Sequence, residues 1–124
     1  MRGHFMALAL CLAGPLAAQD WAVRGGDIRL SAQDLRDLAD GATLTYHDGG
    51  VSKFSAGGAY SYTYANGGGS AFGVFHIAED GRVCINYRNG FSRCDIYVRK
   101  NGVLLMLSEA GERFPVRLTL GLEP

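Results

Sequence analysis

The sequence has no excess of charge of either sign. Its 124 residues carry 12 Lys and Arg against 12 Asp and Glu, with three His, so the formal net charge is zero. A balanced charge excludes the strongly basic surface with which proteins bind nucleic acid or an anionic membrane. The sequence also lacks an apolar run of the ~20 residues that a membrane-spanning helix needs. Its length predicts one domain rather than two.

Proline is scarce, with three residues, whereas glycine is abundant, with 18. That is about twice the usual share of glycine. Six Tyr and six Phe accompany it. This composition predicts short strands joined by tight turns rather than a disordered tract.

Motifs of several enzyme classes are missing. There is no Gly-x-Ser-x-Gly nucleophile elbow. The run Gly67–Ser70 lacks the lysine of a phosphate-binding loop, and no helix is predicted after it. Residues 25–27, Gly-Gly-Asp, do not fit a dinucleotide fingerprint. We therefore expect no nucleotide cofactor.

Residues 1–18 have the order of a secretory signal peptide. A short basic start precedes an apolar run, Phe5–Ala13, and small residues end the segment at Ala18. We expect cleavage after Ala18, a single β domain over residues 19–124 and a periplasmic location. Two alternatives remain for the segment: a buried N-terminal helix, or lipidation at Cys11.

Cys84 and Cys94 lie in one predicted hairpin around the turn Asn89–Gly90. A two-residue loop would place Cys84 opposite Asp95. A three-residue loop with a left-handed Gly90 places the two cysteines opposite each other, about as close as a disulfide requires. The sequence therefore predicts the second register and a structural disulfide. A redox pair or a zinc site is disfavoured, because the first usually has Cys-x-x-Cys spacing and the second needs more ligands.

The segment from Ser31 to Gly41 predicts a short helix. Ser31 is a good N-cap, and Asp34 lies three residues further, near the positive end of the helix dipole. Leu35 and Leu38 share one face, and Gly41 suits the C′ position. The preceding residues form a lead-in with one alternating piece around Trp21.

Beyond this helix the hydrophobic period changes to two. The connections contain two to five residues rich in Gly and Asn, too short for parallel crossovers. We predict a mainly β fold: an antiparallel meander of about eight short strands, closed as a small barrel or strongly curled, with one short N-terminal helix. The expected strands are 42–47, 51–55, 59–65, 71–78, 82–88, 91–99, 103–108 and 113–120.

Two of these strands carry further predictions. Residues 103–107 are apolar on both faces, so their strand should be central. In the last strand, Pro115 cannot donate to a ladder, which predicts an edge strand or a bulge. The same strand should be half-buried through alternating apolar residues, namely Phe114, Val116, Leu118 and Leu120.

Candidate ligand-binding residues are Tyr60, Tyr62, Tyr64 and His76. The three tyrosines alternate along one strand, so they share a face that could stack on sugar rings or a peptide. The alternative is a stripe belonging to the core or barrel wall. His76, like His47, has no carboxylate at metal-ligand spacing, so we expect no metal site. A basic group is interpreted as a solvated face: Arg82, Arg88, Arg93, Arg99 and Lys100.

The order of features resembles a family of small exported proteobacterial β domains with a two-cysteine hairpin. The likeness spans residues 31–118, and the resemblance implies no catalytic residue. It is carried by the signal segment, by Asp80–Cys84 followed by Cys94, and by Leu35, Leu38, Gly41, Thr43 and Leu44.

We therefore predict a non-enzymatic periplasmic or secreted module that binds a small ligand, a glycan or an envelope protein, with no cofactor. One alternative is a small hydrolase or lyase that uses His76 or His47. Another is an inhibitor of an envelope enzyme that presents a glycine-rich loop.

Overall fold

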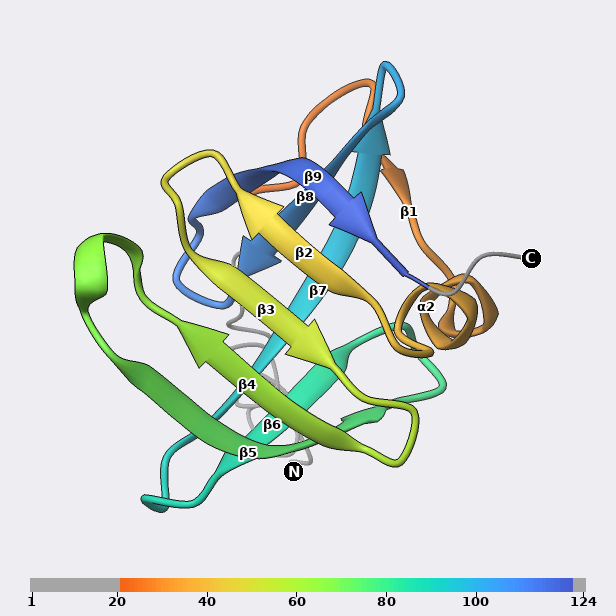
Figure 1. Cartoon of the computed structure of the whole chain (residues 1–124). Helices are drawn as coiled ribbons and strands as arrows, with labels where there is room; N and C mark the ends of the chain where they lie inside the picture. Colours follow the sequence, from red (N-terminus) through yellow and green to blue (C-terminus); the bar gives the residue numbers. More distant parts are fainter. Residues whose placement is uncertain (1–20, 122–124) are drawn as a thin grey trace, which may run out of the picture.

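The computed structural model describes residues 21–121 and shows a closed antiparallel barrel of eight strands, β2 to β9, with one short helix (Figure 1). Each strand pairs with the next along the chain, and β9 pairs back with β2. The predicted signal peptide lies outside the described residues. The elements are β1 (Ile28–Arg29), α2 (Ala32–Leu38), β2 (Thr43–Tyr46), β3 (Val51–Phe54), β4 (Ala59–Thr63), η2 (Ala65–Gly67), β5 (Ser70–Ile77), β6 (Val83–Tyr87), β7 (Ser92–Lys100), β8 (Val103–Ser108) and β9 (Arg113–Leu120).

The meander, the barrel and the single short helix confirm the predicted fold class. Short connections leave neighbouring strands antiparallel, and eight strands suffice to close a sheet on itself. No helix within residues 21–121 is long and apolar enough to cross a membrane.

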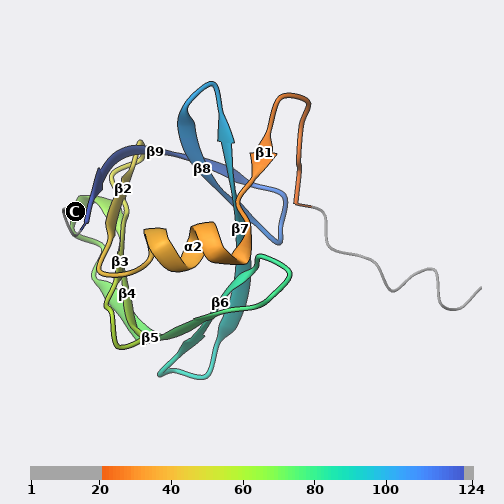
Figure 2. The ribbon, with the colours of Figure 1, turned by 90° about the vertical axis from the view of Figure 1, so that its right-hand side faces the viewer.

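Helix α2 covers one end of the barrel (Figure 2). Its start follows from a capping box. Ser31 Oγ accepts a hydrogen bond from the backbone N–H of Asp34 at 3.1 Å, and the Asp34 carboxylate accepts one from the Ser31 N–H at 3.0 Å. Leu35 packs into the barrel core with 1% of its surface exposed. The C-cap is Ala39, which makes Asp40 the C′ residue, so the prediction of Gly41 at C′ is wrong by one residue; Gly41 follows with a φ of +87°.

The lead-in forms a strap on the outside of the barrel. The predicted alternating piece around Trp21 is not a strand; the lead-in instead forms β1, which pairs with the end of β7. Trp21 packs against an outer apolar cluster on β7 and β8. This cover explains why residues 103–107 are apolar on both faces. The outer cluster consists of Ile96, Val98, Leu105 and Leu107.

Arg113 of β9 fixes the strap. Its two terminal nitrogens donate to the Asp27 carboxylate at 2.8 and 3.1 Å, and Nη1 also donates to the Ala22 carbonyl at 3.0 Å. A bidentate guanidinium–carboxylate pair is among the strongest hydrogen-bonded contacts in proteins. The hydrogen bond from Arg113, with a further one from the Arg24 N–H, lowers the pKa of Asp27 to about 2.

The ion pair between Arg113 and Asp27 predicts that the stability of the protein falls in acid. Because the folded pKa of Asp27 lies below its ordinary 3.8, its contribution is complete above pH 4 and is lost as the pH falls towards 2. Urea denaturation between pH 2 and pH 6 should therefore show a smaller acid-induced loss of stability in Arg113→Gln than in the wild type. Arg117→Gln, an exposed change on the same strand, is the control. Parallel pH profiles for the wild type and Arg113→Gln would contradict the assignment.

The prediction that the four alternating apolar residues of the last strand form its buried face is wrong for Leu118 and Leu120. These side chains are 45% and 59% exposed, whereas Val116 is buried. The register of the ladder between β2 and β9 shifts between Val116 and Leu118. Arg117 is therefore a bulge residue without a partner on β2, and the positions that face inward are reversed beyond it. The bulge expected from Pro115 thus lies two residues later, and β9 is not an edge strand because it lies between β8 and β2.

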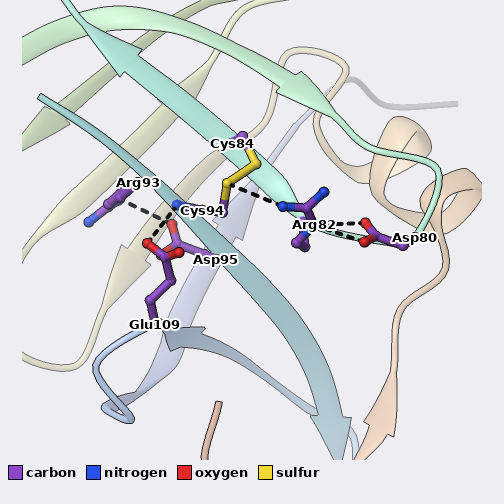
Figure 3. The surroundings of a disulfide bond; sticks show 7 residues. All are labelled: Asp80, Arg82, Cys84, Arg93, Cys94, Asp95 and Glu109. Carbon is purple, nitrogen blue, oxygen red and sulfur yellow. Dashed lines mark hydrogen bonds and ion pairs between the residues drawn. A yellow bond between two sulfur atoms is a disulfide. The ribbon is translucent and has the colours of Figure 1, made fainter. Parts of the chain in front are cut away.

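The predicted disulfide is confirmed. Cys84 lies opposite Cys94 in the ladder between β6 and β7, and the two sulfur atoms are bonded (Figure 3). Gly90 has a φ of +96°, as the three-residue loop requires. The neighbouring Val83 and Ile85 belong to the barrel core, so the two cysteines lie on the outer face of the wall.

Candidate functional site at the loop end of the barrel

The end of the barrel opposite α2 is formed by connecting loops, and we call it the loop end (Figure 1). The described α-helix lies at the opposite end, and the short 3₁₀ helix η2 forms part of one of these loops. The loops that meet there are 47–50, 64–69, 88–91 and 109–112.

Beneath the loop end, the barrel holds a cluster of hydroxyl groups. Tyr46 Oη and Ser52 Oγ share a hydrogen bond of 2.8 Å, and Ser52 Oγ and Tyr60 Oη share another of 2.8 Å. Tyr97 Oη lies 3.5 Å from Tyr46 Oη. These side chains come from β2, β3, β4 and β7, so the network joins both sides of the barrel. Ser52 is completely buried.

Arg93 and Asp95 lie beside this network on β7. Arg93 Nη2 donates to Tyr60 Oη at 3.1 Å, and Arg93 Nε lies 3.3 Å from Asp95 Oδ2 (Figure 3). The second contact is an ion pair without hydrogen-bond geometry, and both Asp95 oxygens are buried with no hydrogen-bond partner among the described residues. The Arg93 guanidinium lies 5.7 Å from the ring centre of Tyr62 and 5.9 Å from that of Tyr87. The Arg93 side chain is 30% exposed, compared with 1% for Asp95.

Burial dominates the electrostatics of this cluster. It raises the pKa of Asp95 to about 6, although the Arg93 guanidinium acts in the opposite direction; the negative charge of Glu109 adds to the rise. Burial also raises the pKa of Tyr46 to about 12 and that of Tyr60 further. The phenols therefore stay protonated at physiological pH, whereas the Asp95 carboxyl group can change its charge near pH 6.

The structure divides the predicted tyrosine stripe. Tyr60 is 3% exposed and belongs to the core, as the alternative interpretation of the stripe supposed. Tyr62 is half-buried at the loop end. The exposed ring of Tyr64, just beyond β4, lies edge-on to the Tyr62 ring, with 4.9 Å between the two ring centres. The Tyr62 hydroxyl lies where a side chain at position 50 would be, so Gly50 allows its close approach.

His76 is not brought together with the tyrosines. It lies opposite Cys84 on the outer face, where it helps to line a hollow of about 300 Å³ with Arg82, Glu109 and a part of Arg93. Within residues 21–121, neither His76 nor His47 has a hydrogen bond or ion pair with a carboxylate. The same part of the chain holds no group of three or more His, Cys, Asp and Glu that could bind a metal ion.

Sequence reasoning missed Arg93, Asp95 and Ser52. The interpretation of Arg93 as part of a solvated basic face is wrong, because its side chain lies on the inner face of the barrel with Asp95. The signal was present in the predicted hairpin. The register that pairs the two cysteines also places Asp95 opposite Val83 and Arg93 opposite Ile85, on the apolar face.

A scan against protein-family models and searches of curated proteins and of solved structures find no match to this chain. The resemblance to exported β domains therefore stays a prediction, and the functional argument depends on the geometry of the loop end.

Proposed function

We propose that this protein is a non-enzymatic binding module that takes up a small molecule at the loop end of its barrel. The observation that carries the proposal is the pair Arg93–Asp95, enclosed in the barrel beneath partly exposed tyrosines. A buried ion pair is often no more stabilising than apolar residues of the same volume. Charged groups with a perturbed pKa cluster at functional sites.

The loop end offers complementary kinds of contact to a small molecule. Tyr62 and Tyr64 present ring surfaces for stacking, and Arg93 presents a partly exposed cation. A hollow of about 210 Å³ lies beside Tyr87, with Ala71 and Arg88 also in its wall. The interior below is filled by side chains, which supports binding at the rim rather than a deep lipid cavity.

The periplasm is the compartment that we propose for this activity. Its oxidising conditions favour the disulfide between Cys84 and Cys94, and residues 1–18 have the order of a signal peptide.

The test uses the purified domain over residues 19–124, labelled with ¹⁵N, and a panel of small acids, neutral sugars and aromatic alcohols. We expect binders to shift the amide signals of residues 62–64 and 87–93 without shifting those of residues 55–58, at the other end of the barrel. Alanine at both Tyr62 and Tyr64 should abolish the shifts, whereas Leu120→Ala removes an exposed apolar side chain at the other end of the barrel and should leave them unchanged. Binding unaffected by the tyrosine change, or shifts confined to the outer face, would contradict the proposal.

The hydrolase or lyase alternative has less support. It needs a histidine activated by a carboxylate, and within residues 21–121 neither His76 nor His47 has a carboxylate as a hydrogen-bond or ion-pair partner. No observation favours the inhibitor alternative over ligand binding.

A further inference from the structure

The partner of Arg93 is poorly placed to neutralise it. Nε of Arg93 lies 3.3 Å from Asp95 Oδ2 without a hydrogen bond, although carboxylates usually accept two parallel bonds from a guanidinium. Nη2 is bound to Tyr60, a neutral hydroxyl. The Arg93 side chain is 30% exposed, and its guanidinium lies beside the rings of Tyr62 and Tyr87, so this cation is open to an anion that enters next to these rings.

Asp95 opposes such an anion. It is sealed from solvent, and two negative charges around one guanidinium in a site of low dielectric repel each other strongly. A neutral Asp95 removes that repulsion and leaves the charge of Arg93 uncompensated. Protonation of Asp95 and binding of an anion at Arg93 therefore favour each other, since linkage between two sites is reciprocal.

We propose that the loop-end site binds small carboxylic acids through Arg93, and that binding is coupled to the uptake of one proton by Asp95. This inference rests on the proposed function and adds the ligand class and its control by pH. The ring surfaces of Tyr62 and Tyr64 favour an acid whose carboxylate is attached to a six-membered ring, either an aromatic ring or a sugar.

Within residues 21–121, no other group that acts on Asp95 supplies this pH dependence in the same direction. His76 borders the outer-face hollow that Arg93 also lines, and the Asp95→Asn variant separates any contribution of His76 from that of Asp95. The phenols stay protonated over the range concerned, and Arg93 stays charged. Glu109 contributes a negative charge that favours the proton on Asp95. The groups that act on Asp95 or surround it are Arg93 and Tyr97 from β7, Tyr46 from β2, Ser52 from β3, Tyr60 from β4, Tyr87 from β6 and Glu109 after β8.

The expected size of the effect follows from the fraction of protein that carries the proton. With a pKa of about 6, about one molecule in 30 is protonated at Asp95 at pH 7.5, and most are at pH 5. The dissociation constant of a ring carboxylate should therefore be up to about 30-fold lower at pH 5 than at pH 7.5. Such an acid, with an ordinary pKa near 4, is still mostly ionised at pH 5.

The experiment measures binding of benzoate against benzamide and of glucuronate against glucose, by NMR titration at pH 5 and pH 7.5. The two acids distinguish an aromatic from a sugar ligand, and the neutral partners test for the charge. We expect at least one acid to bind better than its neutral partner, with the stated pH dependence. Asp95→Asn should bind that acid as well at pH 7.5 as at pH 5, whereas Asp40→Asn, an exposed change beside α2, should keep the wild-type profile.

Arg93→Gln combined with Asp95→Asn tests the cation without leaving an unpaired buried carboxylate, and it should lose acid binding. Arg99→Gln, an exposed change at the far end of the same strand, should retain it. Equal binding of acids and neutral partners at the loop end, or loss of binding in Arg99→Gln rather than in the Arg93 variant, would overturn this inference and leave the proposed function standing. If neither the acids nor the neutral molecules shift the signals of residues 87–93, both are overturned.

Discussion

Exchanging Cys84 and Cys94 together for alanine should lower the free energy of unfolding by about 2–3 kcal/mol. The bond closes a loop with a sequence separation of 10, and in the chain-entropy model a loop of this size contributes about that amount. Reduction of the wild type should cost a similar amount, because the folded ladder between β6 and β7 keeps its backbone hydrogen bonds. Urea denaturation of the variant, and of the wild type with and without a reductant, measures the difference.

Removing the disulfide should also loosen the candidate site. Cys94 lies between Arg93 and Asp95, so the disulfide fixes β7 at the point where those two side chains enter the barrel. The Cys94 N–H also donates to Glu109 Oε1 at 3.3 Å, which ties the loop after β8 to the same point (Figure 3). We therefore expect hydrogen exchange in the double-alanine variant to accelerate more at residues 92–95 than at residues 55–58. Uniform acceleration across the barrel would mean that the bond only stabilises the fold globally.

The sequence predicted the ladder of the barrel because turn chemistry and side-chain period are local properties. Asn89–Gly90 favours a hairpin, and the requirement that two sulfur atoms meet selects its register without reference to any tertiary contact. The missed β1 has only two residues, Ile28–Arg29, too few to show a period. The bulge at Arg117 was misplaced because it depends on how β9 meets β2, and these strands lie far apart in the sequence.

The candidate site was harder to predict from the sequence, because charged residues normally lie at the solvent-exposed surface. Arg93 and Asp95 differ from the other charged residues of the hairpin only in the face that they occupy, and that face is set by the pairing of Cys84 with Cys94. The tyrosines were identified by their alternation, but alternation alone does not separate the buried Tyr60 from the exposed Tyr64. That difference arises from depth in the barrel, which requires the closed fold.

Arg93→Met should be strongly destabilising at pH 7.5, by about 2–4 kcal/mol. Removing one member of a buried ion pair typically costs about 3–5 kcal/mol, because the other charge is left uncompensated, and the 30% exposure of Arg93 reduces this figure. The cost should fall as the pH is lowered to 5, because a protonated Asp95 no longer needs a cation. The wild type should also be slightly more stable at low pH. The folded pKa of Asp95, about 6, exceeds its ordinary 3.8, so the contribution of Asp95 to the free energy of unfolding is complete below pH 4 and is lost as the pH rises through 6.

The double variant Arg93→Met/Asp95→Leu separates stability from function. Replacing both charges with apolar side chains of similar volume should restore stability to within about 1 kcal/mol of the wild type, or exceed it, at every pH between 5 and 8. Urea denaturation of the wild type, both single variants and the double variant at pH 5 and pH 7.5 completes the cycle. A stable double variant that no longer binds the small molecules bound by the wild type would show that the barrel does not need the pair to fold, and that the pair is kept for recognition. A double variant as unstable as Arg93→Met would instead assign Arg93 and Asp95 to the architecture of the barrel.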